Sequence, residues 1–424
     1  MNYLAVLGRE PHISLAELSA LFDNVKQIAP NLAVFKIGPV PTVNIRTGDR
    51  PGGGPPLSLR SGGGEGLAGP VPNINRLGGT LKLAAKLEVS PLDYLKVLPE
   101  GKLTIGVSDY SNHASKKTAS LEALKLKKIL VRHGRSVRVV ENRDAILSTA
   151  TSLHNGLSGK NERKIEFIKH NTNWYHIIGV QDIDAYSKRD QARPARDARV
   201  GMLPPKLAQI LINLCGPLPK GSRILDPFCG TGVVLQEALL MGYQAYGTDL
   251  SEKMIDYSTR NIEWISKSAL EETFAGRCRE RREPSPVKTG ARTPGSEKAL
   301  FEINVGDATN FEWQPPIDAV ACEGYLGQPM TQIPSDIKLK TEKQECGNII
   351  LGFLENLAAQ IKPNTPIVIA APAWLRKDGT YERLDILDEI SNMGYNVNKT
   401  SRDGLLYHRE NQIVARDIII LRKN

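Results

Sequence analysis

Two acidic residues beside a glycine turn are the first candidates for chemistry in this sequence. Asp226 comes directly before a Pro-Phe-Cys-Gly-Thr-Gly turn that contains Gly230 and Gly232. The apolar run before Asp226 predicts a strand and Val233 a helix start, and glycines permit the tight bend between them. Asp249 ends a second alternating run, the position from which an open α/β sheet bonds a ribose hydroxyl. The spacing therefore predicts a nucleoside-binding site.

The composition of the turn narrows the choice of nucleoside. A dinucleotide site has Gly-x-Gly-x-x-Gly and a P-loop has Lys-Ser/Thr after its glycines, whereas this turn has neither. The Asp226 carboxylate would repel a pyrophosphate, but it suits a cationic amino-acid group such as that of S-adenosylmethionine. A glycine turn in another Rossmann-like protein is the alternative interpretation.

The run from Asp226 to Gly232 resembles motif I of the class I methyltransferases, in the form found in enzymes that methylate amino groups. This resemblance implies that Asp307 bonds the adenine amino group of the cofactor and that Ala308 lies against the ring. The cofactor-binding residues that it implies are Asp226, Phe228, Gly230, Gly232, Asp249, Asp307 and Ala308. Because predicted strands and helices alternate after residue 200, we expect a Rossmann-like, doubly wound α/β sheet.

The overall composition favours a polyanionic partner. The 424 residues carry a formal net charge of +9, which suits nucleic acid, although solubility alone would also explain it. No apolar run approaches the ~20 residues of a membrane helix and the amino terminus has no signal-peptide pattern, so we expect a cytoplasmic protein. The five cysteines form no Cys-x-x-Cys pair, so we expect neither a metal site nor a disulfide framework.

Two low-complexity segments interrupt an otherwise ordered pattern. Residues 39–73 are rich in Gly and Pro, and residues 275–298 are basic and proline-rich. Such segments bury too little apolar surface to offset the entropy of ordering them, so we expect two disordered insertions. Ahead of the first, a helix is predicted to begin at Ser14, with Glu17 at the spacing of a capping box.

A basic amphipathic helix is predicted from Thr118 to Arg132. Its apolar side is expected to consist of Leu121, Leu124, Ile129 and Leu130, facing inward. The outward cations are expected either to contact RNA phosphates or to form a solvated surface. The candidate RNA-binding residues are Lys125, Lys128 and Arg132.

Further segments resemble the archaeal and eukaryotic tRNA guanosine-10 N2-methyltransferases. They are residues 4–11, 77–80, 154–157 and 193–209. The resemblance implies tRNA as the partner and a THUMP domain ahead of the catalytic domain. It predicts a small α/β module at 1–38, a THUMP-like RNA-binding domain at 74–185 and a methyltransferase domain at 186–424. The THUMP-like domain is expected to be an α+β region, and the methyltransferase domain is expected to contain the doubly wound sheet.

The loop after the fourth predicted strand departs from the family pattern. Amino methyltransferases have Asp/Asn-Pro-Pro-Tyr/Phe there, in which the acid and a backbone carbonyl accept the two amine N–H bonds and the aromatic ring stacks on the base. This chain has Cys322-Glu-Gly-Tyr-Leu-Gly. We interpret Glu323 as the catalytic polar group and Tyr325 as the stacking residue, with Cys322 as the alternative occupant of the acid's position.

These observations predict an S-adenosylmethionine-dependent RNA methyltransferase that acts on the exocyclic N2 amine of a guanosine in tRNA. Two alternatives remain open on the sequence. A DNA methyltransferase acting on adenine N6 or cytosine N4 could share the glycine turn, and a tRNA-binding relative could keep the fold without turnover. No protein partner is indicated.

Overall fold

A computed structural model describes residues 2–37, 72–197, 203–278, 300–410 and 412–424, with the backbone alone for 268–278. The chain divides into two compact units. Unit 1 contains residues 1–5, 22–74 and 82–180, and unit 2 contains residues 6–21, 75–81 and 181–424. The predicted insertions 39–73 and 275–298 lie outside the described residues, apart from 72–73 and 275–278. Residues 275–278 are helical, which corrects the predicted start of the second insertion.

Unit 1 is built around an eight-stranded sheet. Its neighbouring strands, in order, are β2 Asp23–Ala29, β3 Leu32–Lys36, β1 Asn2–Leu7, β4 Thr80–Lys86, β8 Asn173–Val180, β7 Lys164–His170, β5 Leu103–Asp109 and β6 Val137–Val139. The helices of this unit are α2 Pro91–Lys96, α3 Lys116–Arg132 and α4 Thr149–His154, and the short turn η1 Ile74–Arg76 precedes β4. Strands β7 and β8 pair in antiparallel register.

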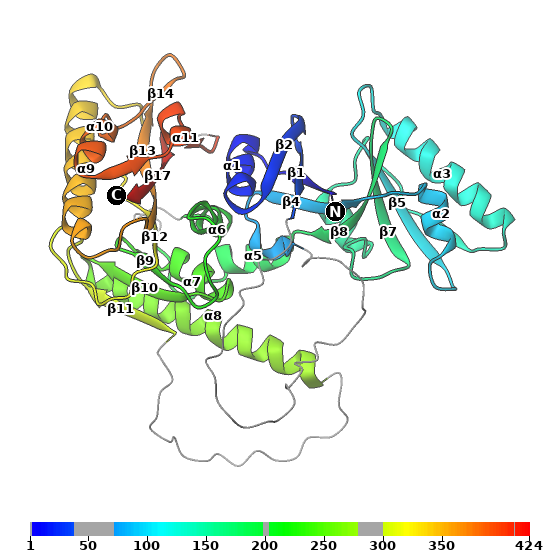
Figure 1. The fold of residues 1–424 in the computed structure, drawn as a ribbon, viewed down its shortest axis with the longest axis horizontal. Helices are drawn as coiled ribbons and strands as arrows, with labels where there is room; N and C mark the ends of the chain where they lie inside the picture. Colours follow the sequence, from blue (N-terminus) through cyan, green and yellow to red (C-terminus); the bar gives the residue numbers. More distant parts are fainter. Residues whose placement is uncertain (1, 38–71, 198–202, 279–299, 411) are drawn as a thin grey trace, which may run out of the picture. The chain divides into compact units, whose positions relative to one another are not determined.

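The sequence pattern placed only part of the apolar side of helix α3 correctly, since Leu130 is buried as predicted. Leu121 and Leu124 are 47% and 51% exposed, so the prediction that they face inward was wrong. The buried residues are Ala119, Ala123 and Leu130. Ala123 belongs to the same core cluster as Ile105 and Phe167 of the sheet. The small alanine side chains allow α3 to lie close to β5 (Figure 1).

Unit 2 contains the predicted doubly wound sheet. Its strand order is β11 Phe301–Val305, β10 Gln244–Asp249, β9 Arg223–Asp226, β12 Ala319–Glu323, β13 Pro366–Leu375, β17 Val414–Lys423 and β15 Tyr395–Val397. The strands from β11 to β13 run parallel, and β17 is antiparallel to both of its neighbours. The short strands β14 Tyr381–Glu382 and β16 Leu406–Tyr407 extend β13 and β17.

Helices cover both faces of this sheet, as the α/β class requires. Alternate residues of β12 enter different clusters: Ala319 and Ala321 pack with α6 and α7, and Val320 and Cys322 pack with α9. Figure 1 shows α9 beside β12, β13 and β17. The helices of the unit are α1 Pro11–Leu21, α5 Ile183–Gln191, α6 Pro205–Leu214, α7 Val233–Leu240, α8 Glu252–Cys278, α9 Asp336–Ala358, α10 Leu387–Asn392 and α11 Lys399–Asp403. None of the helices in the described ranges is long and apolar enough to cross a membrane.

Helix α1 begins at Pro11, so the predicted start at Ser14 with a capping box was wrong. The Ser14 hydroxyl donates to the Gly79 carbonyl at 2.7 Å. The Glu17 carboxylate accepts from the Gly78 and Gly79 N–H groups, each at 2.8 Å, and from the Asn213 amide at 2.7 Å. Both side chains therefore serve long-range contacts inside unit 2, because buried backbone N–H and C=O groups need partners.

Glu17 predicts a pH dependence of stability. Burial is the larger influence and raises the pKa of Glu17 from 4.5 to about 7, although its three donors lower it. The folded protein then binds a proton more tightly than the unfolded chain, so the stability from this group is complete below pH 4.5 and is lost as pH rises through about 7. In urea unfolding, the stability of the wild type relative to Glu17→Gln should fall by up to about 3 kcal/mol over that window.

Ser14→Ala is the matched control, because it removes a buried hydrogen bond from the same contact without removing a titratable group. Its stability cost of about 1 kcal/mol should be the same at every pH. A wild-type-to-Glu17→Gln difference that is flat between pH 4.5 and 7 would contradict this account.

Candidate functional site

The candidate site lies where the strand order of unit 2 reverses direction. The chain runs from β9 outward to β10 and β11, and then returns to β12 on the other side of β9. In open α/β sheets, ligands bind beyond the carboxyl ends of the strands at such a switch point. Asp226 ends β9, Asp249 ends β10 and Glu323 ends β12, and these strands are parallel. The fold therefore brings three acids, predicted separately from sequence, to one edge of the sheet.

Asp226 is the most deeply buried of these acids, at 2% exposed. Its Oδ1 accepts from the Phe228 N–H at 3.2 Å. Burial raises the pKa of Asp226 well above its ordinary value, and the nearby charges of Asp249 and Glu323 raise it further. A carboxyl group in this position is shielded from solvent and lies near other negative charges. An adjoining cation would therefore favour its ionised form.

Asp249 is bonded directly to the glycine turn. Its Oδ2 accepts from the Gly230 N–H and its Oδ1 from the Ser251 N–H, each at 2.9 Å. Burial raises the pKa of Asp249, while these two donors lower it. Gly230 has φ 52°, in the left-handed region that glycine adopts without strain. The second predicted acid therefore also holds the turn in shape.

The loop after β11 lies next to Asp249. The Gly306 N–H donates to the Asp249 carbonyl at 2.9 Å. The Asp307 Oδ1 accepts from both the N–H and the hydroxyl of Thr309, at 2.9 and 2.8 Å. Ala308 is buried, and its carbonyl accepts from the Asn356 amide at 3.0 Å. The two positions assigned to adenine thus sit on a loop anchored to Asp249.

Phe228 is the remaining predicted cofactor residue. It is partly buried against the core cluster, and its ring meets Phe353 edge to face at 5.3 Å. Phe353 belongs to α9 and is fully buried. The position of the Phe228 ring is consequently set by the helix on one face of the sheet, not by the glycine turn itself.

Glu323 and Cys322 point to opposite faces of β12, as neighbours in a strand must. Cys322 lies in the hydrophobic core, where burial raises the pKa of its thiol well above the ordinary value. The Glu323 Oε1 accepts from Arg416 Nε at 2.8 Å. Glu323 is therefore the member of the pair whose polar group reaches the carboxyl edge of the sheet. The Gly324 N–H donates to the Ala370 carbonyl at 3.0 Å, a bond that the proline of the family pattern could not make.

Tyr325 follows two residues after Glu323 and packs against the core cluster with its ring partly exposed. Its hydroxyl accepts from the Gln328 amide at 3.0 Å. Burial is the main cause that raises the pKa of Tyr325, and Glu345 adds to it. The neutral phenol ring is available as a flat apolar surface.

The three candidate RNA-binding cations lie on α3 in unit 1 and are not part of this site. All are exposed, and Leu121 and Leu124 share their outward side of the helix. Lys125 lies 3.8 Å from Glu122. Contact with RNA at Lys125, Lys128 and Arg132 remains a prediction.

Two features of the site were missed in the sequence. Arg416 lies within an apolar strand, and a charged residue there was itself a signal of a buried partner. Asn261 of α8 donates to the carbonyls of Ala195 and Thr231, each at 2.9 Å. It thereby ties the glycine turn to the 193–197 segment, and nothing in its local pattern distinguished it from a surface asparagine.

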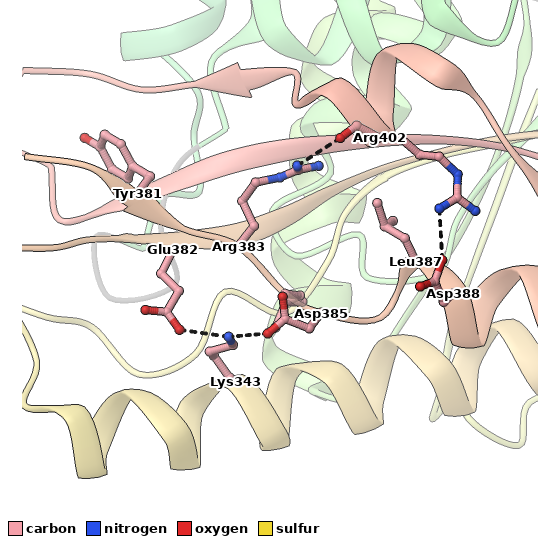
Figure 2. A pocket seen from close by; sticks show the side chains of 9 residues that line it. Lys343, Tyr381, Glu382, Arg383, Asp385, Leu387, Asp388 and Arg402 are labelled. Atoms are coloured by element: carbon pink, nitrogen blue, oxygen red, sulfur yellow. Dashed lines mark hydrogen bonds and ion pairs between the residues drawn. The ribbon is translucent and has the colours of Figure 1, made fainter.

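A pocket of about 500 Å³ elsewhere in unit 2 contains none of the predicted site residues. Figure 2 shows that its charges neutralise one another. Lys343 bonds Glu382 at 2.9 Å and Asp385 at 2.7 Å, and Arg402 bonds Asp388 at 2.9 Å. Within the described ranges, no group of three or more His, Cys, Asp or Glu side chains is placed to hold a metal ion.

Comparisons with known proteins point to one kind of domain. Residues 193–323 match the RMKL-like methyltransferase domain family. Over 205 residues the chain is 26% identical to the tRNA (guanine(10)-N2)-dimethyltransferase of Methanothermobacter thermautotrophicus, covering 48% of this chain and 49% of that protein. Over 63 residues it is 44% identical to the tRNA (guanine(10)-N2)-dimethyltransferase of Pyrococcus abyssi, covering 15% and 18%.

The chain thus spans about half the length of the first of these relatives. The crystal structure of TrmN from Thermus thermophilus aligns with a TM-score of 0.44 and 16% identity over 100% of both chains. The sequence matches are sufficient to confirm the resemblance to this group of methyltransferases.

Gly232 offers a test of how tightly the turn is packed. It has φ 77°, and a Cβ atom there would lie 2.5 Å from the Ser258 hydroxyl. Gly242 has a similar φ of 82°, but a Cβ atom would meet only the end of Lys220, at 4.0 Å. Both alanine variants lose about 1 kcal/mol to backbone strain, and Gly232→Ala should lose a further 1–3 kcal/mol to overlap. Equal costs in thermal unfolding would show that the turn is loosely packed.

Proposed function

We propose that this chain is an S-adenosylmethionine-dependent methyltransferase that acts on the exocyclic N2 amine of a guanosine in tRNA. The observation that carries the proposal is the gathering of the Asp226, Asp249 and Glu323 carboxylates at the switch point of the sheet. The matches to methyltransferases named for a tRNA guanine support the reaction and the substrate.

The residues present suit this cofactor by charge. Burial raises the pKa of Asp226, and the nearby charges of Asp249 and Glu323 raise it further. Such surroundings favour a ligand with an ammonium group and a sulfonium. Asp226 would lie at the methionine amine, Asp249 at the ribose hydroxyls and Asp307 at the adenine amine. Ala308 and Phe228 would supply apolar contacts, and Gly230 and Gly232 would let the backbone approach the ligand. When bound, S-adenosylmethionine supplies an electrophilic methyl group.

Glu323 and Tyr325 then act on the base. The amine lone pair of guanine is conjugated into the ring, so this conjugation must weaken before the lone pair can attack the methyl group. Glu323 accepts an amine N–H bond and so orients the nitrogen, while Tyr325 stacks on the ring. The Glu323 carboxylate also takes the proton that the nitrogen loses on methylation. A weak base suffices, because the newly methylated amine still carries two hydrogens and a positive charge and is a strong acid.

The larger tRNA contact is assigned to unit 1. We propose that residues 74–185 form a THUMP-like RNA-binding domain preceded by a small α/β module at 1–38, and that Lys125, Lys128 and Arg132 contact phosphates. The net charge of +9 supports this assignment. A cytoplasmic location follows from tRNA as the substrate.

Asp249 tests the cofactor assignment. Asp249→Ala should weaken S-adenosylmethionine binding at least 100-fold in calorimetric titration, because it removes the ribose acceptor and releases the Gly230 N–H. Asp256→Ala is the control, since Asp256 is exposed and bonds only Arg260 among the described residues. Unchanged affinity in Asp249→Ala would exclude the ribose role.

A labelled methyl donor identifies the substrate. The wild-type protein is incubated with total tRNA and, separately, with duplex DNA, and the products are digested to nucleosides. Label in N2-methylguanosine from tRNA is expected. Label in methyladenine or methylcytosine from DNA would replace the tRNA proposal, and binding of tRNA without label transfer would indicate a non-catalytic relative.

A further inference from the structure

Arg416 forms an ion pair with Glu323 at the candidate site. Its Nε lies 2.8 Å from the Glu323 Oε1, and the two side chains are 7% and 15% exposed. Arg416 comes from β17, two strands away from β12 in the sheet. Its Nη1 also donates to the Gln412 amide oxygen at 3.1 Å, so the guanidinium is held at two of its nitrogens.

This ion pair sets the direction from which the Glu323 carboxylate can accept further hydrogen bonds. The Oε2 atom makes no hydrogen bond with any residue that the structure describes, and Oε1 has a second lone pair beyond the one that Arg416 uses. An ionised carboxylate accepts hydrogen bonds and donates none. Because Gln412 holds the guanidinium at Nη1, the bond from Nε restricts the positions that the carboxylate can take.

The reacting edges of the three candidate bases differ in what they offer such an acceptor. Guanine presents two donors side by side, the ring N1–H and the N2 amine. Adenine and cytosine also carry an amine, but the neighbouring ring nitrogen (N1 or N3) is an acceptor whose lone pair would face the carboxylate. Enzymes that act on a base read it by hydrogen bonds to this edge. A fixed carboxylate therefore fits guanine and repels the other two.

We propose that Arg416 is a positioning residue that fixes the Glu323 carboxylate as a two-oxygen acceptor, and that this pair selects a guanine edge over an adenine or cytosine edge. The inference rests on the proposed function and assigns its base specificity to one ion pair. The ion pair also accounts for Gly324 after Glu323, where the family pattern has proline after the acid. The contact from β17 supplies the rigidity that proline would otherwise give.

A purely structural ion pair is the competing explanation, and the same strand provides one for comparison. Asp417, the next residue of β17, bonds Arg383 at 2.7 Å and is buried. Buried ion pairs add little net stability over apolar packing, yet breaking one is costly. Arg416→Gln and Arg383→Gln should therefore destabilise the fold comparably, and only the first should change the choice of base.

The first readout is binding in the absence of the methyl donor. Guanosine 5′-monophosphate is compared with 2-aminopurine riboside 5′-monophosphate, which keeps the amine but has an acceptor at N1, using ligand-observed NMR titration. The wild type and Arg383→Gln should prefer guanosine monophosphate at least tenfold. Arg416→Gln should reduce the preference below threefold, and Arg416→Lys should restore part of it. Glu323→Gln should reverse the preference, because its amide offers one acceptor and one donor.

The second readout is transfer to tRNA. Arg416→Gln should lower kcat at least tenfold with the affinity for S-adenosylmethionine unchanged, while Arg383→Gln keeps kcat within twofold. A folded Arg416→Gln protein with the wild-type preference and kcat would overturn the role of Arg416 alone. A wild-type protein that methylates DNA, or that neither methylates tRNA nor prefers guanosine monophosphate, would overturn the proposed function as well.

Discussion

The negative charge gathered at the carboxyl ends of β9, β10 and β12 is the constraint on which the rest of the site depends. Asp226 is buried beside Asp249 and Glu323, and each of the other two acids raises its pKa. Such a grouping disfavours folding unless hydrogen bonds, a cation or protonation offsets it. The protein supplies backbone N–H groups to Asp226 and Asp249 and a guanidinium to Glu323. The remaining deficit of positive charge is what a cationic ligand would fill.

The glycine turn is held by contacts from several elements. The Asp249 carboxylate bonds Gly230, the Ser258 hydroxyl bonds the Gly230 carbonyl at 3.1 Å, and the Asn261 amide bonds the Thr231 carbonyl. These partners come from β10 and α8, which follow the turn in sequence. A loop fixed from outside in this way is preorganised, so little ordering entropy is lost when a ligand binds.

A second buried polar network includes Gln209 and Asn213 of α6. The Glu17 carboxylate joins α1, the 78–79 turn and Asn213 of α6, and a separate set joins Gln209 to Tyr186 and Glu237. Each polar group in such a network needs a hydrogen-bond partner, because a buried polar group without one destabilises the fold by about 1–3 kcal/mol. Residues 6–21 and 75–81 thereby belong to unit 2, although the intervening chain belongs to unit 1.

The sequence by itself determined the local chemistry: the turn from Asp226 to Gly232, the acid at Asp249, the strand ending at Glu323 and the α/β order of elements. These follow from glycine geometry, hydrophobic period and residue type, all of which act over a few positions. Only the tertiary structure placed Cys322 in the hydrophobic core and Glu323 in contact with Arg416, since the face of a strand depends on its sheet neighbours. It also decided that Arg416 contacts Glu323, which lies 93 positions earlier in the chain, and which side of α3 faces outward. In the same way, it decided that Ser14 and Glu17 bond the backbone of Gly78 and Gly79. Partners so distant in sequence leave no periodic trace, because packing alone brings them together.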